Sequence, residues 1–424
     1  MKQQDFTNIY FYYLFIITLF TGIIFYDIFN LKTADEICGV ILFILFLKQV
    51  FTSQDWSINK SFLITLVIFI FYLFYSIYIG SNTIKAIGTD FIIQIKPYLA
   101  FFCTYQLMPK FNNNQKKTLQ DICLLFWFLF LPIGIIGATN EHFLNQTVGH
   151  PSCYAAIITA LSLTYLYCSK FSKKEQFTFF IMLAAGIASG RSKFYGFYAL
   201  ALFVVWYLGK TENLKLNTKN IISVLILIIV MSLVAREKLD LYFLQGLSEN
   251  NENKDLIARF MLYSTSFTIL IDYIPFGSGL ASFATHASAI HYSSIYSKYG
   301  IDSVWGLSKS YNKFIADTYY PSLAQFGFIG IMLFILFWLY IINKSIRYSK
   351  ITNNAQLFII TCLIIGYLLI ENIADASFTS NRGLFMMIFL GLIIGNQKEQ
   401  TLTSIIKNKT IKNIEDDSLR QTLS

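Results

Sequence analysis

Long apolar runs alternate with short polar segments along the whole chain of 424 residues. A helix needs about 20 mostly apolar residues to cross roughly 30 Å of membrane hydrocarbon. By this criterion the pattern predicts about twelve membrane-spanning helices in an all-α polytopic membrane protein. These helices are expected at residues 9–29, 34–51, 62–79, 88–107, 119–138, 151–168, 176–190, 192–208, 219–235, 318–343, 355–371 and 382–396.

The segment 236–317 interrupts this pattern. It begins with the polar run "REKLDLYFLQGLSENNENKD" and continues as the amphipathic run "LIARFMLYSTSFTILIDYI", which we expect to lie on or dip into the membrane. The breaker "PFGSG" and the polar run "HASAIHYSSIYSKYG" follow. Loops of this length usually carry function. We therefore divide the chain into nine helices (1–235), a long loop (236–317), three helices (318–396) and a tail (397–424).

The composition and the charges agree with this class. The chain is 55% apolar and 13% charged, with a net charge of +9. If both termini are cytoplasmic, 20 of the 33 Lys and Arg residues lie in cytoplasmic segments, which is the usual orientation signal. The net positive charge then reflects the orientation of the chain in the membrane rather than nucleic-acid binding. In this orientation the long loop lies on the outer face. The six cysteines have neither metal-ligand nor redox spacing, and no cofactor is expected.

Three cations stand within or beside predicted spans, where ionisable residues are costly and mark function by default. Lys96 is the deepest, in "DFIIQIKPYLAFF", and either binds substrate or forms an internal ion pair with Asp90. Arg191 stands in "ASGRSK", where the small residues leave room for an anion, and its neighbour Lys193 is expected to snorkel to water. Arg382 is a candidate for substrate binding or for snorkelling.

The long loop adds five candidates. Arg259 lies in the amphipathic run, as a functional group or as one charge on a polar face. Asp317 opens "DTYYPSLAQFGFIG", where either it or Thr318 could cap the following helix. Pro321 also suits the start of a helix. The remaining candidates are His286, His291 and Tyr311.

Cations gathered at one face suit an anionic ligand carried by the membrane. Guanidinium groups bind phosphate oxygens bidentately, so two arginines and a lysine could hold a diphosphate. The same cations would stabilise that diphosphate as a leaving group. A hydroxyl nucleophile would then need a base, and Asp317, His286 and His291 can each serve.

Three pieces of the chain resemble, in their order, the O-antigen polymerase and O-antigen ligase superfamily of bacterial surface-polysaccharide assembly. They read "SGRSK", "ARFMLYSTSFTILIDYIPFGSGLASF" and "DTYYPSLAQFGFIG". The resemblance covers about 185–340 by motif and the whole chain by topology. It implies a metal-independent glycosyltransferase of the C type in the bacterial cytoplasmic membrane, acting on undecaprenyl-diphosphate-linked glycans. Arg191 and Arg259 would grip the donor diphosphate.

The resemblance leaves three functions open. The first is a polymerase of O-antigen, capsule or exopolysaccharide repeat units, which the segment "IHYSSIYSKYG" favours. The second is a ligase that transfers the glycan to lipid A–core or protein, although ligases carry a histidine where this chain has Asp317. The third is a flippase for lipid-linked oligosaccharide. The implied partners are the lipid-linked donor and acceptor and membrane lipids, with a flippase and a chain-length regulator as protein partners.

Overall fold

The computed structural model describes residues 2–31, 33–52, 58–208 and 254–422. Within these ranges the chain forms helices and turns without a strand, so the all-α prediction is confirmed there. Five helical segments are long and apolar enough to cross a membrane: Phe6–Ile24, Lys60–Ile79, Asn113–Thr139, Pro151–Cys168 and Tyr320–Thr352. These segments support a membrane protein.

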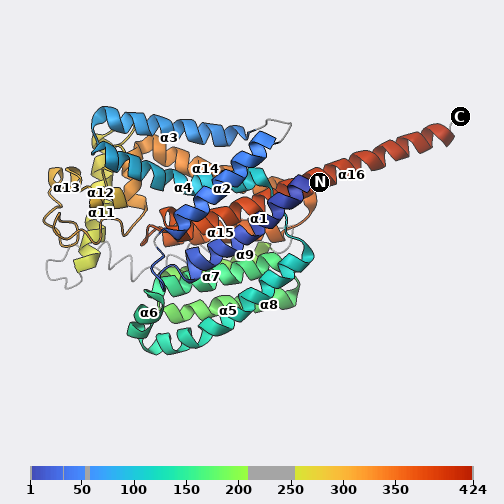
Figure 1. Ribbon diagram of the computed structural model, residues 1–424, viewed down its shortest axis with the longest axis horizontal. Coiled ribbons are helices and arrows are strands. Elements are labelled where there is room, and N and C mark those ends of the chain that lie inside the picture. Colours follow the sequence, from blue (N-terminus) through green and yellow to red (C-terminus); the bar gives the residue numbers. More distant parts are fainter. Residues whose placement is uncertain (1, 32, 53–57, 209–253, 423–424) are drawn as a thin grey trace.

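The long helices lie side by side in a bundle (Figure 1). Every predicted span overlaps a described helix except 219–235, which falls outside the described residues. The bundle helices are α1 Lys2–Leu19, α2 Ala34–Thr52, α3 Lys60–Ile79, α4 Ile84–Leu107, α5 Asn113–Thr139, α7 Pro151–Cys168, α8 Lys173–Ala184, α9 Ser192–Leu208, α14 Gly327–Thr352, α15 Gln356–Glu371 and α16 Asn381–Thr422.

The two ends of the bundle differ. The helices of the long loop, α11 Lys254–Asp272, α12 His286–Ile290 and α13 Ile295–Lys298, gather at one end, which we call the loop end. Both chain termini lie at the other, the termini end (Figure 1). The tail predicted from residue 397 is helical as far as Thr422. The helix α16 continues through it because residues 397–422 contain neither glycine nor proline.

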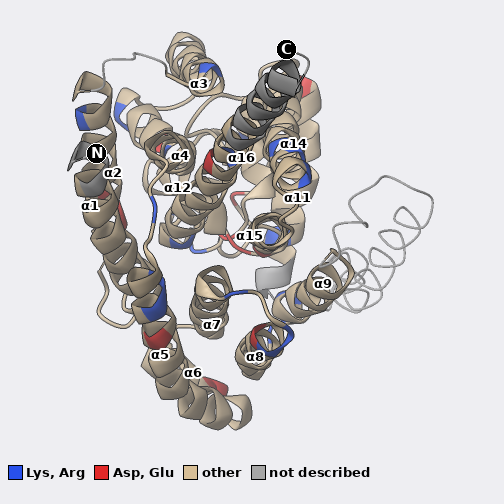
Figure 2. Ribbon diagram, turned by 90° about the vertical axis from the view of Figure 1, so that its right-hand side faces the viewer, with Lys and Arg blue, Asp and Glu red and all other residues tan. Residues whose placement is uncertain are grey.

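The core extends over the bundle helices and includes α7, which is buried along its whole length. Figure 2, which looks along the bundle from the termini end, shows α7 among α5, α8 and α15. Its side chains are apolar or small on every side, as expected of a helix without a solvent face. Nearby, α16 packs closely on α4, where a Cβ on Gly391 would lie 2.6 Å from the carbonyl oxygen of Phe101.

The span predicted at 318–343 begins later than expected. The helix α14 starts at Gly327, and residues Tyr320–Phe326 form the 3-10 helix η5. Asp317 and Thr318 therefore cap neither helix, because Tyr319 and Phe326 occupy the N-cap positions and make no capping side-chain bond. Pro321 stands in the first turn of η5 rather than of the long helix.

Two glycines explain why the chain turns at this junction. Gly277, in "PFGSG", and Gly327 have φ angles of +82° and +64°, which L side chains rarely adopt. A Cβ on either residue would lie 2.3 Å from the backbone nitrogen of the other. The Gly279 amide donates to the Gln325 carbonyl at 2.9 Å. The loop after α11 is thus docked on the start of α14.

The turn between α3 and α4 holds the other side of this loop. The amide of Ala281 donates to the Asp90 carboxylate at 2.7 Å, and the amide of Leu280 donates to the Ser76 hydroxyl at 2.7 Å. The side-chain amide of Asn82 donates to the carbonyls of Ala281 and His291, both at 2.8 Å. Asp90 therefore anchors the loop.

The glycine contact can be tested by adding single methyl groups. Gly277→Ala should cost about 2–5 kcal/mol, because it adds backbone strain to a clash between two main chains. Gly300→Ala is the matched control, since Gly300 has a φ of +67° but nothing within 4 Å of the new Cβ. It should cost about 1 kcal/mol. The measurement is thermal unfolding in detergent, and equal losses for the two variants would show that the contact is unimportant.

Candidate functional site

The loop end carries six ion-paired side chains that we call the ionic cluster: Lys193, Arg259, Asp317, Glu371, Asp375 and Arg382. Arg259 donates from Nε to Oδ2 of Asp317 at 2.7 Å. The Nζ atom of Lys193 lies 2.6 Å from Oε2 of Glu371 and 3.5 Å from Oδ2 of Asp375. Arg382 lies 2.9 Å from the same Asp375. The chain thus brings together residues from α9, α11, the segment before η5, the end of α15, the turn after it and the start of α16.

Hydrogen bonds to two neighbouring backbone carbonyls hold these segments together. The amide of Tyr319, two residues after Asp317, donates to the carbonyl of Asn372 at 3.3 Å. The hydroxyl of Tyr263, one helical turn after Arg259, donates to the carbonyl of Ile373 at 2.7 Å. Both partners belong to the short turn that carries Glu371 and Asp375. The two halves of the cluster are therefore fixed to the same turn.

The two aspartates of the cluster have opposite electrostatic environments. Burial raises the pKa of Asp317 above its usual range, although the neighbouring Arg259 opposes this shift. Burial would also raise the pKa of Asp375, but Arg382 and Lys193 outweigh it, so the pKa of Asp375 is lowered. Asp375 thus remains an anion, whereas Asp317 accepts a proton more readily. When the pKa values of two carboxyl groups in one site are pushed apart in this way, one group often serves as the acid or base while the other stays ionised.

Arg191 forms the rim of the site. It follows Gly190, whose φ of +66° turns the chain between the 3-10 helix η2 (Ala185–Ser189) and α9. Its Nη2 atom lies 2.6 Å from Glu141 on α6 (Glu141–Val148) and 3.5 Å from Nε2 of His150. Partial burial of its ring, followed by the positive charge of Arg191, lowers the pKa of His150. This histidine is therefore neutral at pH 7.

Several guanidinium donors at this end have no described partner. Nε and Nη1 of Arg382 and Nε of Arg191 are buried and make no hydrogen bond within the described part of the chain. Buried donors are normally satisfied, and a buried guanidinium group without partners is costly. The site therefore has unused capacity for an anion whose oxygens can reach several donors at once.

The structure brings some of the predicted residues together and separates others. Arg259, Asp317 and Arg382 lie in the cluster, and Arg191 lies beside it. Lys96 does not join them, because it pairs with Asp35 at 2.5 Å. The expected competing pair of Lys96 with Asp90 is therefore wrong. The expected snorkelling of Lys193 is also wrong, because its side chain is only 14% exposed and pairs with Glu371.

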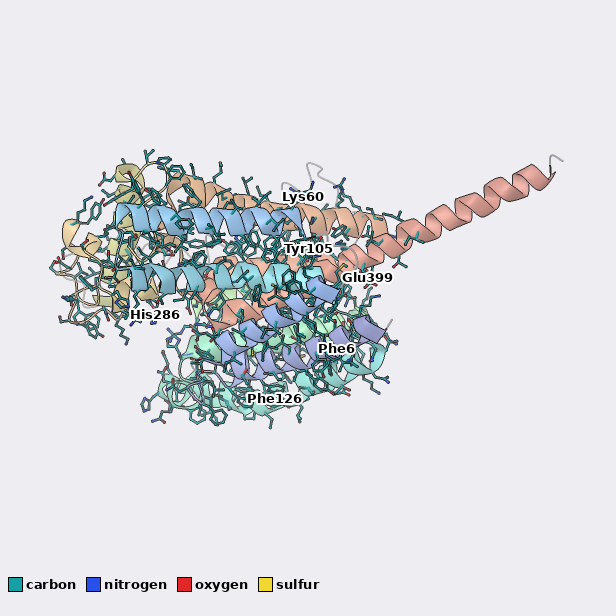
Figure 3. All side chains as sticks on the ribbon, turned by 45° about the horizontal axis from the view of Figure 1, so that its top comes forward. Phe6, Lys60, Tyr105, Phe126, His286 and Glu399 are labelled. Carbon is teal, nitrogen blue, oxygen red and sulfur yellow. The ribbon has the colours of Figure 1, made fainter. Side chains whose placement is uncertain are left out.

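The three remaining candidates lie elsewhere on the long loop. His286 is exposed on α12, at the end of the bundle opposite Tyr105 and Glu399 (Figure 3). His291 ends α12, and the ring of Tyr311 lies 4.8 Å from that of Trp305. Over the described residues, no hydrogen bond or ion pair joins these three side chains to the ionic cluster.

The sequence alone assigns no functional role to Lys193, Glu371, Asp375 or His150, which belong to the site. Glu371 and Asp375 are spaced i and i+4 after an apolar run, and with Arg382 they form a charged turn visible in the sequence. That signal marks the two acids as neighbours of Arg382. Nothing in the sequence places Lys193 or His150 beside that turn, because both come from distant segments.

In the described part of the chain, no group of three or more His, Cys, Asp or Glu side chains could hold a metal ion. Neither a comparison with models of protein families nor a comparison with curated proteins finds a match for this chain. The contacts at the loop end therefore carry the functional argument.

The pairing of Lys193 with Glu371 can be tested by a double-mutant cycle. Lys193→Met alone leaves a carboxylate with 3% side-chain exposure without its cation, and it should cost roughly 3–5 kcal/mol of unfolding free energy. Adding Glu371→Gln should recover much of this loss, because no buried charge then remains unpaired. Thermal unfolding in detergent is the measurement.

Lys110→Met is the control for this cycle. Lys110 pairs with Glu399 at the termini end, but its side chain is 53% exposed. Its removal should cost less than about 1 kcal/mol. A double variant that is no more stable than Lys193→Met would show that the pair is not the source of the effect.

Proposed function

We propose that the chain is a membrane glycosyltransferase whose substrate is a glycan linked to a lipid diphosphate. The observation that carries this proposal is the convergence of Arg191, Lys193, Arg259 and Arg382 at the loop end, with buried guanidinium donors left over. A diphosphate offers several oxygens and more than one negative charge. It can therefore engage donors that single carboxylates leave unused.

The carboxylates of the cluster explain how the site can be stable without this ligand. Each cation has an acidic partner, so no net charge is buried. Asp317 keeps 30% of its side chain exposed, so the pair with Arg259 can open toward water. When the donor binds, Arg259 turns from Asp317 to the diphosphate. The donor thus replaces one anion by another at the same guanidinium group.

This exchange would also prepare the base. The positive charge of Arg259 holds down the pKa of Asp317, so its withdrawal raises that pKa further and makes the carboxylate more basic. The acceptor hydroxyl attacks the anomeric carbon, and its proton passes to Asp317. The bond from that carbon to the phosphate oxygen breaks, and the lipid diphosphate leaves with its charge stabilised by the cations.

A repeat-unit polymerase is the form of this activity that we favour. Asp317 stands where ligases of the resembled superfamily carry a histidine, and it lies in the cluster whereas His286 and His291 do not. The acceptor would be the next lipid-linked repeat of an O-antigen, capsule or exopolysaccharide. Deleting the gene in its host should remove the ladder of surface polymers and leave single repeats. Loss of attached glycan with polymer still on the carrier would indicate a ligase instead.

Substitutions at the cations and at the base should have different effects on transfer. Arg191→Ala and Arg259→Ala should abolish transfer from the lipid-linked donor, and the Lys variants should restore it only partly, since lysine loses the bidentate geometry. Asp317→Asn should still bind donor, but its transfer rate should fall roughly a hundredfold or more. Transfer and donor binding are measured in purified membranes.

Lys309→Ala is the control, because Lys309 is an exposed cation of the same loop outside the cluster. Its transfer rate should be unchanged. Normal transfer by Asp317→Asn together with an inactive His291→Ala would assign the base to His291. Full activity of both Arg→Ala variants would refute the diphosphate site.

The proposal also places the loop end outside the cytoplasmic membrane and both termini inside. A cysteine at Ser294, which is exposed near α13, should react with an impermeant thiol reagent on intact cells. A cysteine at Thr403, on the part of α16 toward the C-terminus, should react only after permeabilisation. Background should be low, because five native cysteines are buried and Cys362 is partly buried. The opposite labelling pattern would place the cluster in the wrong compartment.

A further inference from the structure

A groove runs along the bundle between α3 and α14. Its cavity has a volume of about 220 Å³. The side chains of Tyr98, Phe102 and Phe337 line it, and the ring centroids of Tyr98 and Phe337 are 4.8 Å apart. Both walls belong to segments that are long and apolar enough to cross a membrane. The groove therefore lies at the depth of membrane hydrocarbon.

The groove opens sideways. Ile64 on α3 and Leu336 on α14 line it and are 59% and 49% exposed. Other large apolar side chains flank them on the same two helices, including Val67 and Met332. In a membrane protein such exposed positions face hydrocarbon. A lipid chain can therefore enter between α3 and α14 from the side without passing through water.

The length and the two ends of the groove fix the direction of its occupant. Its lining runs along α3 from Ser61 to Tyr72, about 17 Å at the helical rise per residue. This is about half of a hydrocarbon core of roughly 30 Å. Ser61 stands near the start of α3, which Lys60 marks in Figure 3. At the loop end the lining includes Tyr319, which is two residues from Asp317 and is bonded to the turn that carries Glu371 and Asp375.

We propose that this groove binds the isoprenoid chain of the lipid-diphosphate substrate, with the diphosphate held at the ionic cluster. The inference rests on the proposed function. It assigns the groove to the lipid chain of the substrate and leaves the ionic cluster to its diphosphate. A groove that begins beside a cluster of cations suits a chain whose head carries two phosphates. Its aromatic walls suit an unsaturated, methyl-branched chain, which offers flat surfaces and branches for packing.

The test is photo-crosslinking of the purified full-length protein. The probe is a polyprenyl diphosphate with a diazirine in its chain, and the comparison probe is phosphatidylglycerol with a diazirine in an acyl chain. We expect the polyprenyl probe to label peptides of α3 and α14, and unlabelled polyprenyl diphosphate to compete. If the phosphatidylglycerol probe labels the groove equally and polyprenyl diphosphate does not displace it, the groove is a site for ordinary lipid and the proposal fails.

Matched tryptophan variants localise the effect. Leu333→Trp fills the groove, whereas Met332→Trp places the same side chain at an exposed position that does not line it. Leu333→Trp should lower labelling about tenfold, the effect of excluding roughly two buried methylene groups. Met332→Trp should label normally. Ile68→Trp, on the opposite wall, replaces Leu333→Trp if that variant does not fold. Equal labelling by the groove variants and Met332→Trp would overturn the proposal.

The chain length of the donor separates this proposal from the proposed function. With a long-chain donor, Leu333→Trp should raise the KM for transfer, while a short-chain donor that does not reach Leu333 should be affected little. If the parent protein is crosslinked in the groove but transfers no glycan, the proposed glycosyltransferase activity is refuted and the proposal for the groove stands. Transfer by the parent with no crosslink in the groove would refute the groove alone.

Discussion

The compensation of buried charge is the constraint on which the loop end of this structure depends. Cations at the end of a helical bundle lose much of their hydration, and each needs an anion close by. The chain supplies Asp317, Glu371 and Asp375 within the cluster and Glu141 at its rim. Because each pair joins two different segments of the chain, the pairs also determine how α6, α9, α11, α15 and α16 meet. The same pairs leave a place where an incoming anion can compete.

The long loop can take part only because its backbone is fixed at two points. Gly277 meets Gly327 at the start of α14, and Asp90 receives the amide of Ala281 beside the α3–α4 turn. These contacts hold α11 across the loop end, and with it Arg259. The glycine motifs of the sequence thus have a steric reason here, since any side chain at either position would strike the opposing main chain. They position the cluster and make no contact with its charges.

The sequence predicts the helices well and the partners of the charges poorly. Apolar runs fix the helices because their length and composition are local properties, and most limits differ by only a few residues. The start of α14 at Gly327 was missed because it depends on a backbone contact with Gly277, fifty residues earlier. The local pattern offers Lys96 an ion pair with nearby Asp90, Lys193 snorkelling to water and Asp317 a helix cap, the first and last as alternatives to substrate binding and to the role of base. Their partners are Asp35, Glu371 and Arg259, which no local pattern connects to them.

A binding titration tests the diphosphate site most directly, because it needs neither the glycan nor turnover. Purified protein is titrated calorimetrically with farnesyl diphosphate and farnesyl monophosphate, alongside the variant Asp317→Asn. The account predicts tighter binding of the diphosphate than of the monophosphate. It also predicts a further gain in diphosphate affinity in the variant, where the carboxylate of Asp317 no longer competes for Arg259. Equal affinity for the two ligands, with no gain in Asp317→Asn, would contradict it.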